Sequence, residues 1–126
     1  MKIASWNVNG IRARLDHVSQ WLQTNQPDVL ALQETKVMDE MFPLDVFKPL
    51  GYQASIYGQK SYNGVAFLTK KSPTGLTKGI EGFTDDQTRV IAGIFSGVLI
   101  INVYVPNGQS VGSEKFDYKM RWLKHF

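Results

Sequence analysis

The sequence predicts an α/β fold with a mixed, mostly antiparallel sheet and flanking helices. Two patterns lead to this prediction. Residues 2–34 contain a short apolar strand, an amphipathic helix and a fully apolar strand, in the order of a βαβ unit. After Gly51, runs of β-branched and aromatic residues alternate with short turn sequences, as they do in antiparallel hairpins. No linker separates the two parts, so residues 1–126 are expected to form one domain without an internal boundary.

The first strand is predicted over residues 2–8 and should end at Asn9-Gly10, a dipeptide that favours turns. A helix should follow over residues 11–24, because apolar residues recur there on one helical face. Pro27 ends this helix, since the residue before a proline is disfavoured in the helical conformation. The apolar face consists of Ile11, Leu15, Val18 and Leu22, with Trp21 beside it.

A second strand, predicted over residues 28–34, contains the uninterrupted apolar run Val29–Leu32 and should be buried on both faces. Two strands joined by one helix pair in parallel, through a right-handed crossover. Their carboxyl ends then lie at the same edge of the sheet, with Asn7 beside Glu34. Ligands of open α/β sheets bind at this edge, so we expect a functional site there.

The middle of the chain is predicted to be rich in strands. Residues 39–50 should be helical or irregular only over short stretches, because two prolines interrupt them. The four-residue and shorter connections that follow indicate antiparallel hairpins packed onto the parallel pair. The strands are expected over residues 52–57, 64–70, 89–95 and 98–105, with a further edge strand over residues 76–80.

A last helix is predicted to begin at Ser113-Glu114, with Phe116, Met120 and Leu123 on its apolar face. The amphipathic pattern continues to Phe126 without a capping residue. We therefore expect the natural sequence to continue beyond this point.

Composition excludes several classes of protein. The chain has no cysteine, which excludes disulfides, thiolate metal sites and cysteine nucleophiles and fits a cytoplasmic protein. The amino terminus lacks the apolar segment of a signal peptide, and the longest apolar run, Val98–Ile101, is too short to cross a membrane. A net charge of +3 permits a polyanionic partner without requiring one.

Glu34 is the strongest candidate for a metal ligand, because it follows a buried strand where the core needs no charge. Magnesium commonly takes only one or two protein carboxylates and completes its shell with water and phosphate oxygens. Asn7 is unusual inside a strand and could orient a phosphate or a carboxylate, although a role in the turn is equally consistent. Lys36 could contact a phosphate, and its alternative is a solvated surface lysine.

Weaker candidates lie in loops that could face the same edge. The stretch around Tyr62 interleaves aromatic residues, glycine and lysine, a combination that can hold a nucleic-acid backbone. Arg12 opens the first helix, and exposed helix arginines are common. Tyr104 precedes a Pro-Asn-Gly turn that contains Asn107, and the two residues either contact phosphate or serve the turn alone. Neither histidine lies near the proposed edge.

Several motifs in this order resemble the exonuclease III family of abasic-site endonucleases, within the endonuclease/exonuclease/phosphatase superfamily. They are Ser5-Trp6-Asn7-Val8-Asn9-Gly10-Ile11-Arg12, Leu32-Gln33-Glu34-Thr35-Lys36, Tyr62-Asn63-Gly64-Val65-Ala66, Arg89-Val90-Ile91 and Tyr104-Val105-Pro106-Asn107-Gly108. The resemblance implies a four-layer α/β sandwich, of which this chain would be half. It also implies a Mg2+- or Mn2+-dependent hydrolase that cleaves duplex DNA 5′ to abasic sites and trims 3′ ends.

The resemblance assigns roles by position. Glu34 matches the metal-ligand glutamate, Asn7 the catalytic asparagine near the metal, and Tyr104 the catalytic tyrosine near the scissile phosphate. Asn107 matches a polar contact to the same region, and Arg12 and Tyr62 match contacts to the DNA backbone. These assignments agree with the candidates that the residues alone suggested.

The chain departs from the family pattern in its second half. The Gly-Asp-x-Asn motif, which orients the attacking water, and the Ser-Asp-His motif, which stabilises the phosphate, are both absent. We therefore expect the chain to be the amino-terminal half of such a domain, with little catalysis alone and an exposed inner sheet face. That face would bind the missing carboxyl-terminal half or a second copy. The alternatives are a non-catalytic DNA-binding fragment and another phosphoesterase branch, such as phosphoinositide phosphatases or sphingomyelinases.

Overall fold

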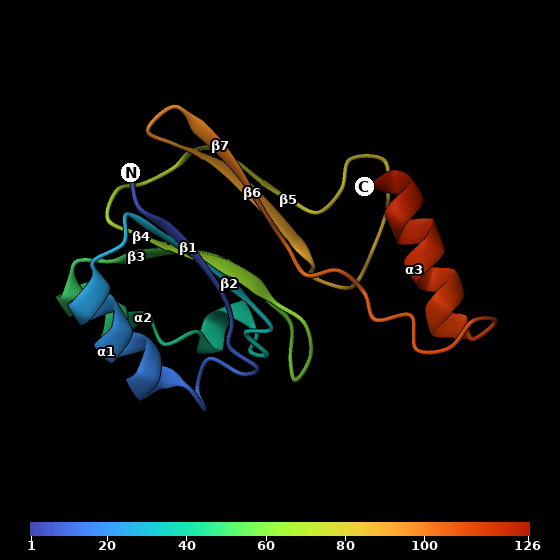
Figure 1. Cartoon of the computed structure of the whole chain (residues 1–126), viewed down its shortest axis with the longest axis horizontal. Coiled ribbons are helices and arrows are strands. Elements are labelled where there is room, and N and C mark those ends of the chain that lie inside the picture. Colours follow the sequence, from blue (N-terminus) through green and yellow to red (C-terminus); the bar gives the residue numbers. More distant parts are fainter.

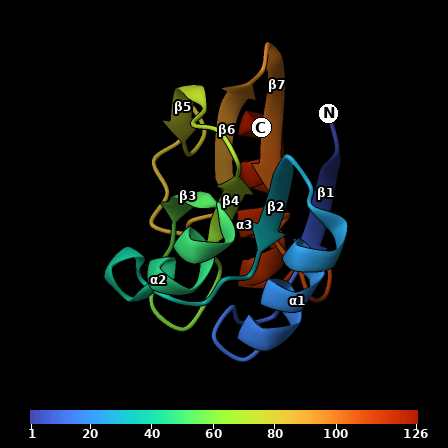
Figure 2. The same ribbon diagram turned by 90° about the vertical axis from the view of Figure 1, so that its left-hand side faces the viewer.

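Two β-sheets packed face to face form the centre of the computed structural model, which describes residues 1–126 (Figure 1). The first sheet has four strands in the order β1-β2-β4-β3, and the second has three in the order β5-β6-β7. Helices α1 and α2 cover the outer side of the first sheet, while α3 lies beyond the second sheet (Figure 2). The predicted α/β class with mixed and antiparallel pairing is therefore confirmed.

The βαβ unit is formed by β1 (Ile3–Asn7), α1 (Leu15–Asn25) and β2 (Val29–Gln33). Its strands are parallel and aligned so that Asn7 pairs with Gln33. The prediction that α1 begins at residue 11 was wrong by four positions. The amides of Gly10 and Ile11 instead donate to the carbonyls of Glu34 and Thr35, at 2.7 and 3.0 Å. The Ile11 carbonyl accepts from the Arg14 amide at 3.3 Å, so residues 11–14 form a turn before the helix begins.

The remaining strands of the first sheet are antiparallel to their neighbours. Strand β4 (Val65–Thr69) lies between β2 and β3 (Gln53–Tyr57). Residues 39–50, before β3, contain only short helices, as was predicted from the two prolines in this segment. These are η1 (Asp39–Met41), α2 (Leu44–Phe47) and η2 (Lys48–Leu50).

The second sheet consists of β5 (Thr74–Lys78), β6 (Val90–Phe95) and β7 (Val98–Val103), all antiparallel. The predicted edge strand is real but begins at Thr74, inside the stretch expected to be a turn. The pairing of β5 with β6 is irregular in register between Thr74 and Thr77. Every residue of β5 is exposed, so no alternation of buried and exposed residues marked its position in the sequence.

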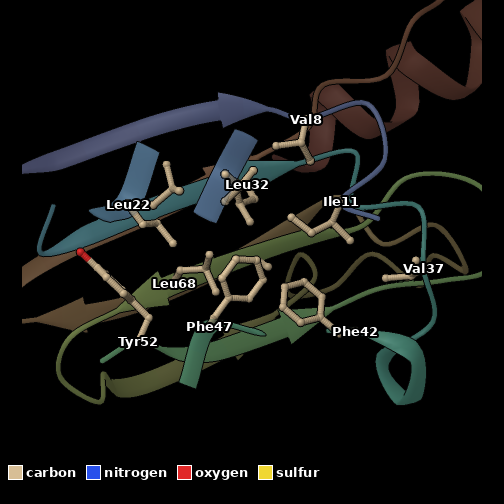
Figure 3. Packing of buried hydrophobic residues seen from close by; sticks show 12 residues of the cluster. Val8, Ile11, Leu22, Leu32, Val37, Phe42, Phe47, Tyr52 and Leu68 are labelled. Carbon is tan, nitrogen blue, oxygen red and sulfur yellow. The ribbon is translucent and has the colours of Figure 1, made fainter. Parts of the chain in front are cut away.

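Strand β2 is buried on both faces, as its apolar run predicted. Leu30 and Leu32 belong to the core between the first sheet and its helices, shown in Figure 3. Val29 and Ala31 point the other way, into a second core between the two sheets. Because the inner sheet faces cover each other, the expected exposed inner face was wrong. The exposed apolar residues of the second sheet include Ile94, Leu99 and Ile101.

Helix α3 (Glu114–His125) begins where the sequence predicted, with the Ser113 hydroxyl accepting a 3.1 Å hydrogen bond from the Phe116 amide. Met120 and Leu123, on its predicted apolar face, are exposed, and Trp122 is the buried residue of the helix. Trp122 stacks on Phe126 within the chain's last turn. None of the helices is long and apolar enough to cross a membrane.

Candidate active site

Asn7 and Glu34 meet at the carboxyl edge of the first sheet, where the parallel register of β1 and β2 places them. The Asn7 Nδ2 donates a 2.9 Å hydrogen bond to Glu34 Oε1. The Asn7 Oδ1 accepts from the Asn9 amide at 3.1 Å, which fixes the orientation of the amide group. Asn7 therefore has both of the roles proposed for it. Its side-chain oxygen stabilises the turn, and its side-chain nitrogen binds the Glu34 carboxylate.

The loop that carries Glu34 has a strained backbone. Glu34 and Lys36 have φ angles of 55° and 58°, in the left-handed region that such residues seldom adopt. Neighbouring backbone holds the loop from two sides. Gly10 and Ile11 donate to its carbonyls, and its amides donate to the carbonyls of residues 63 and 64 at 2.9 and 3.2 Å. Strain held in place by surrounding structure is characteristic of functional sites.

Glu34 is a partly buried carboxylate, with 19% of its side chain exposed. Burial would raise the pKa of this carboxyl, but the hydrogen bond from Asn7 and the nearby Tyr104 hydroxyl and Lys36 ammonium hold the pKa below its ordinary value. Glu34 is therefore ionised at neutral pH. The Lys36 Nζ lies 3.4 Å from Glu34 Oε2 and donates to Asn9 Oδ1 at 2.6 Å. Lys36 is thus paired within the chain and is not a freely solvated surface lysine. It lies beyond the end of β2, which is Gln33.

Tyr104 follows β7 and brings the second sheet to this edge. Burial, followed by the nearby Glu34 carboxylate, raises the pKa of the Tyr104 phenol. The hydroxyl is therefore a neutral donor throughout the physiological range. The Arg89 guanidinium lies 4.9 Å from the centre of the Tyr104 ring.

An open hollow of about 410 Å³ lies beside Tyr104. Three predicted residues share its wall, namely Tyr62, Tyr104 and Asn107. Tyr62 is 71% exposed, as a side chain that binds a partner through its ring would be. The Asn107 Oδ1 accepts from the Gln109 amide at 2.9 Å, so its turn role is present as well. The other lining residues are Asn63, Gln87, Arg89, Glu114, Lys115 and Tyr118.

Four predicted residues, Asn7, Glu34, Arg12 and Lys36, do not line this hollow. Lys36 is paired with Glu34, and Arg12 is exposed in the turn before α1. Sequence reasoning also missed residues that the fold brings to the site. Arg89 was predicted only as the start of a strand and as part of the Arg89-Val90-Ile91 motif, without a role in the site, although it packs on Tyr104. Buried Asn102 binds Gln33 across the sheets at 2.7 Å, and the one signal for it was a polar residue within an apolar strand.

The donor set fits one hard divalent cation held in part by water. No three or more histidine, cysteine or acidic side chains lie together in a group that could hold a metal ion. Glu34 nevertheless supplies an ionised carboxylate whose oxygens keep free lone pairs, which suits magnesium. Asn7 uses its amide hydrogens on Glu34 and thus acts mainly by orienting that carboxylate.

Comparison with known proteins points in one direction. A family model described as the endonuclease/exonuclease/phosphatase family matches residues 4–125. The exodeoxyribonuclease III of Haemophilus influenzae is 40% identical over 97% of this chain and 48% of its own length. The DNA repair nuclease APEX1 of Danio rerio is 38% identical over 97% of this chain and 41% of its own length.

Solved structures agree with these relatives. A 3′-5′ exonuclease from Neisseria meningitidis superposes with a TM-score of 0.96 at 42% identity, covering 99% of this chain and 49% of that one. An AP endonuclease from Archaeoglobus fulgidus gives a TM-score of 0.95 at 42% identity, with the same coverage. The chain thus spans about half the length of the relatives it matches.

Proposed function

The chain belongs to the endonuclease/exonuclease/phosphatase family, and we propose that it forms the Glu34-bearing half of a DNA repair active site. Its relatives are exodeoxyribonucleases, AP endonucleases and DNA repair nucleases. The reaction we propose is hydrolysis of the phosphodiester 5′ to an abasic site in duplex DNA, with trimming of 3′ ends as a second activity. The observation that carries this proposal is one ionised carboxylate that is hydrogen-bonded to Asn7 and paired with Lys36 at a single sheet edge, with the Tyr104 hydroxyl nearby.

Glu34 would hold Mg2+ or Mn2+, which supplies Lewis-acid stabilisation of charge on the phosphate when bound. Asn7 keeps the Glu34 carboxylate oriented through its 2.9 Å hydrogen bond. Tyr104 lines the open hollow and lies near Glu34, so its neutral hydroxyl would donate to a phosphate oxygen bound there. A donor fixed at that position favours the more highly charged transition state over the ground state.

The DNA backbone would be held by residues around this edge. Exposed Tyr62 and the Asn107 turn share the hollow with Arg89 and Lys115. Arg12 and Lys36 add positive charge beside the backbone hydrogen bonds that hold the Glu34 loop. Contacts of this kind position the duplex without reading its sequence. The absence of cysteine agrees with work in a reducing compartment such as the cytoplasm.

Efficient catalysis requires more than this half-site offers. Hydrolysis needs an oriented water as well as charge stabilisation, and no histidine or second carboxylate contacts Glu34. We propose that these groups come from the part of the domain that the longer relatives possess. A non-catalytic DNA-binding role for the chain alone is the second candidate, and the single carboxylate of the site favours it.

The outer face of the second sheet supports the same view. It exposes Ile94, Leu99 and Ile101 on neighbouring strands, with 38%, 60% and 52% of each residue exposed. We propose that the remaining half of the domain covers this face. In its absence the isolated chain should associate with itself, and sedimentation velocity at rising concentration tests this. The double variant Leu99→Lys, Ile101→Lys should stay monomeric.

Titration of Mn2+ by electron paramagnetic resonance tests the central proposal without requiring turnover. Glu34→Gln should weaken Mn2+ binding at least tenfold, because the charge that attracts the ion is lost. Glu81→Gln makes the same chemical change at an exposed position and should leave affinity unchanged. Equal affinity in wild type and Glu34→Gln would remove Glu34 from the metal site.

A second experiment separates the two candidate functions. Duplex DNA containing a tetrahydrofuran abasic analogue should bind the chain and remain largely intact with Mg2+ present. Efficient incision that Glu34→Gln abolishes would overturn the claim that the half-site is insufficient.

A further inference from the structure

Arg89 lies between two tyrosine rings that come from distant parts of the chain. Its guanidinium carbon is 4.9 Å from the centre of the Tyr104 ring and 5.6 Å from that of Tyr118. Tyr104 follows β7, whereas Tyr118 lies on α3. Arg89 therefore connects the helix to the residue that reaches Glu34.

Arg89 holds Tyr104 by its backbone as well as by its ring. The Tyr104 amide donates to the Arg89 carbonyl at 2.8 Å. The Arg89 Nη1 donates back to the Tyr104 carbonyl at 3.1 Å. Arg89 and Tyr104 are thus joined by two hydrogen bonds, and the Arg89 guanidinium also lies over the Tyr104 ring. A tyrosine that is fixed at its backbone and packed against the guanidinium has little freedom to change its orientation.

Arg89 is in turn held on its other side. Its Nε donates to Gln87 Oε1 at 2.9 Å. Tyr118 covers the guanidinium, and the Tyr118 hydroxyl donates to Asp85 Oδ2. Because Nε and one Nη are already used within the chain, the rigid fork of Arg89 is committed to internal contacts. Lys115, in the same hollow, is exposed and carries no such commitment.

We propose that Arg89 is a positioning residue that sets the Tyr104 hydroxyl against Glu34, and that Tyr118 transmits the placement of α3 to this contact. The importance of the contact for catalysis rests on the proposed function, whereas the contact itself does not. An arginine is needed because a lysine offers neither a planar face for two rings nor a forked donor. The position of the Tyr104 hydroxyl then depends on the position of α3, although no residue of α3 contacts Glu34.

The test is the response of the Tyr104 ring to removal of the Glu34 charge, measured by NMR on tyrosine labelled with carbon-13. The chain has five tyrosines, and Tyr104→Phe assigns the resonance. Glu34→Gln should shift the Tyr104 resonance in the wild-type background, with no metal or DNA present. In the Arg89→Met background that shift should fall to a third or less.

The controls separate positioning from general support of the fold. Tyr52 is buried and donates to the Pro27 carbonyl at 2.6 Å, so its resonance should stay unchanged in every folded variant. Arg89→Lys keeps the charge and loses the plane, and should lose at least half of the response. Tyr118→Phe keeps the ring over Arg89 and should retain the response, whereas Tyr118→Leu should reduce it at least twofold.

Three outcomes would overturn the proposal. One is a full Tyr104 response in Arg89→Met or, if that variant does not fold, in Arg89→Lys. Another is an equal response in Tyr118→Phe and Tyr118→Leu. The third is no response of Tyr104 to Glu34→Gln in the wild-type background. Because no metal or DNA is used, these results are independent of the Mn2+ and DNA experiments that test the function.

Discussion

Asn7 and Glu34 are 27 positions apart in the sequence and joined by a 2.9 Å hydrogen bond from Nδ2 to Oε1. The bond exists because β1 and β2 are parallel neighbours that end at the same height. It fixes one carboxylate oxygen and leaves the other facing Lys36. This one pair therefore orients the carboxylate at the edge of the sheet.

Asn7→Ala should weaken Mn2+ binding about tenfold, which is the usual cost of losing a partner that orients a metal ligand. The carboxylate remains, but its pKa rises and its orientation is no longer fixed. Titration by electron paramagnetic resonance at pH 7.5 measures the change. Asn25→Ala, at the end of α1, provides the matched control. Unchanged affinity in Asn7→Ala would show that Asn7 serves only the turn.

Lys36→Met should have opposite effects on the two ligands. Removing a cation 3.4 Å from Glu34 should tighten Mn2+ binding, by a factor of about two to three for a pair of this exposure. Binding of duplex DNA should weaken, and the salt dependence should lose about one phosphate contact. Fluorescence anisotropy over a range of salt concentrations measures this slope. Lys48→Met, in η2, is a charge-matched control and should change neither.

Gly64→Ala should destabilise the chain by about 3 kcal/mol or more, because the new methyl group meets backbone-anchored atoms. Its Cβ would lie 2.1 Å from the Thr35 hydroxyl, at a φ of +94°. Gly51→Ala has a similar φ of +87° but open space, so it should cost only about 1 kcal/mol of strain. Urea denaturation compares them. Equal losses would mean that the loop around Glu34 moves away freely.

Asn102→Ala should cost about 3 kcal/mol, because it leaves buried polar groups without partners. The Asn102 amide donates to the carbonyls of Leu32 and Ala66 at 3.0 and 2.8 Å, in the other sheet. Ser5→Ala removes an exposed hydrogen bond to Gln33 and should cost less than about 0.5 kcal/mol. Denaturation in urea tests both. A loss below 1 kcal/mol for Asn102→Ala would mean that water replaces the bridge.

The Tyr118 hydroxyl should stabilise the fold at neutral pH and stop doing so in alkali. Burial, followed by the hydrogen bond to Asp85, raises the pKa of this phenol, while Arg89 opposes the rise. A group with a raised folded pKa contributes fully below its unfolded pKa, near 10 for tyrosine, and loses its contribution as the pH rises through the folded value. Unfolding free energies of wild type and Tyr118→Phe should therefore differ at pH 8 and converge above pH 10. A constant difference would contradict this.

Much of the fold could be predicted because its signals are local. The apolar run in β2 required burial on both faces, and Asn9-Gly10 required a turn. The placement of Asn7 beside Glu34 followed from chain topology, and the structure confirms it. The predicted roles of Arg12 and Tyr62 in binding DNA stay predictions.

Other features depended on contacts that no local pattern records. Helix α1 begins at Leu15 because residues 11–14 form a turn, in which the Ile11 carbonyl accepts from the Arg14 amide. The buried side of α3 was set by Trp122 and its neighbours, although the helical periodicity indicated Met120 and Leu123.

The sequence by itself determined the βαβ unit, the fully buried β2 and the carboxylate that emerges from it. These follow from hydrophobic periodicity and the handedness of the crossover, which act over short stretches of chain. Tertiary structure alone decided that Tyr104 reaches Glu34, and that Arg89 lies between Tyr104 and Tyr118. Those contacts require two sheets and a helix to pack together. Such packing depends on the shape and polarity of surfaces far apart in sequence.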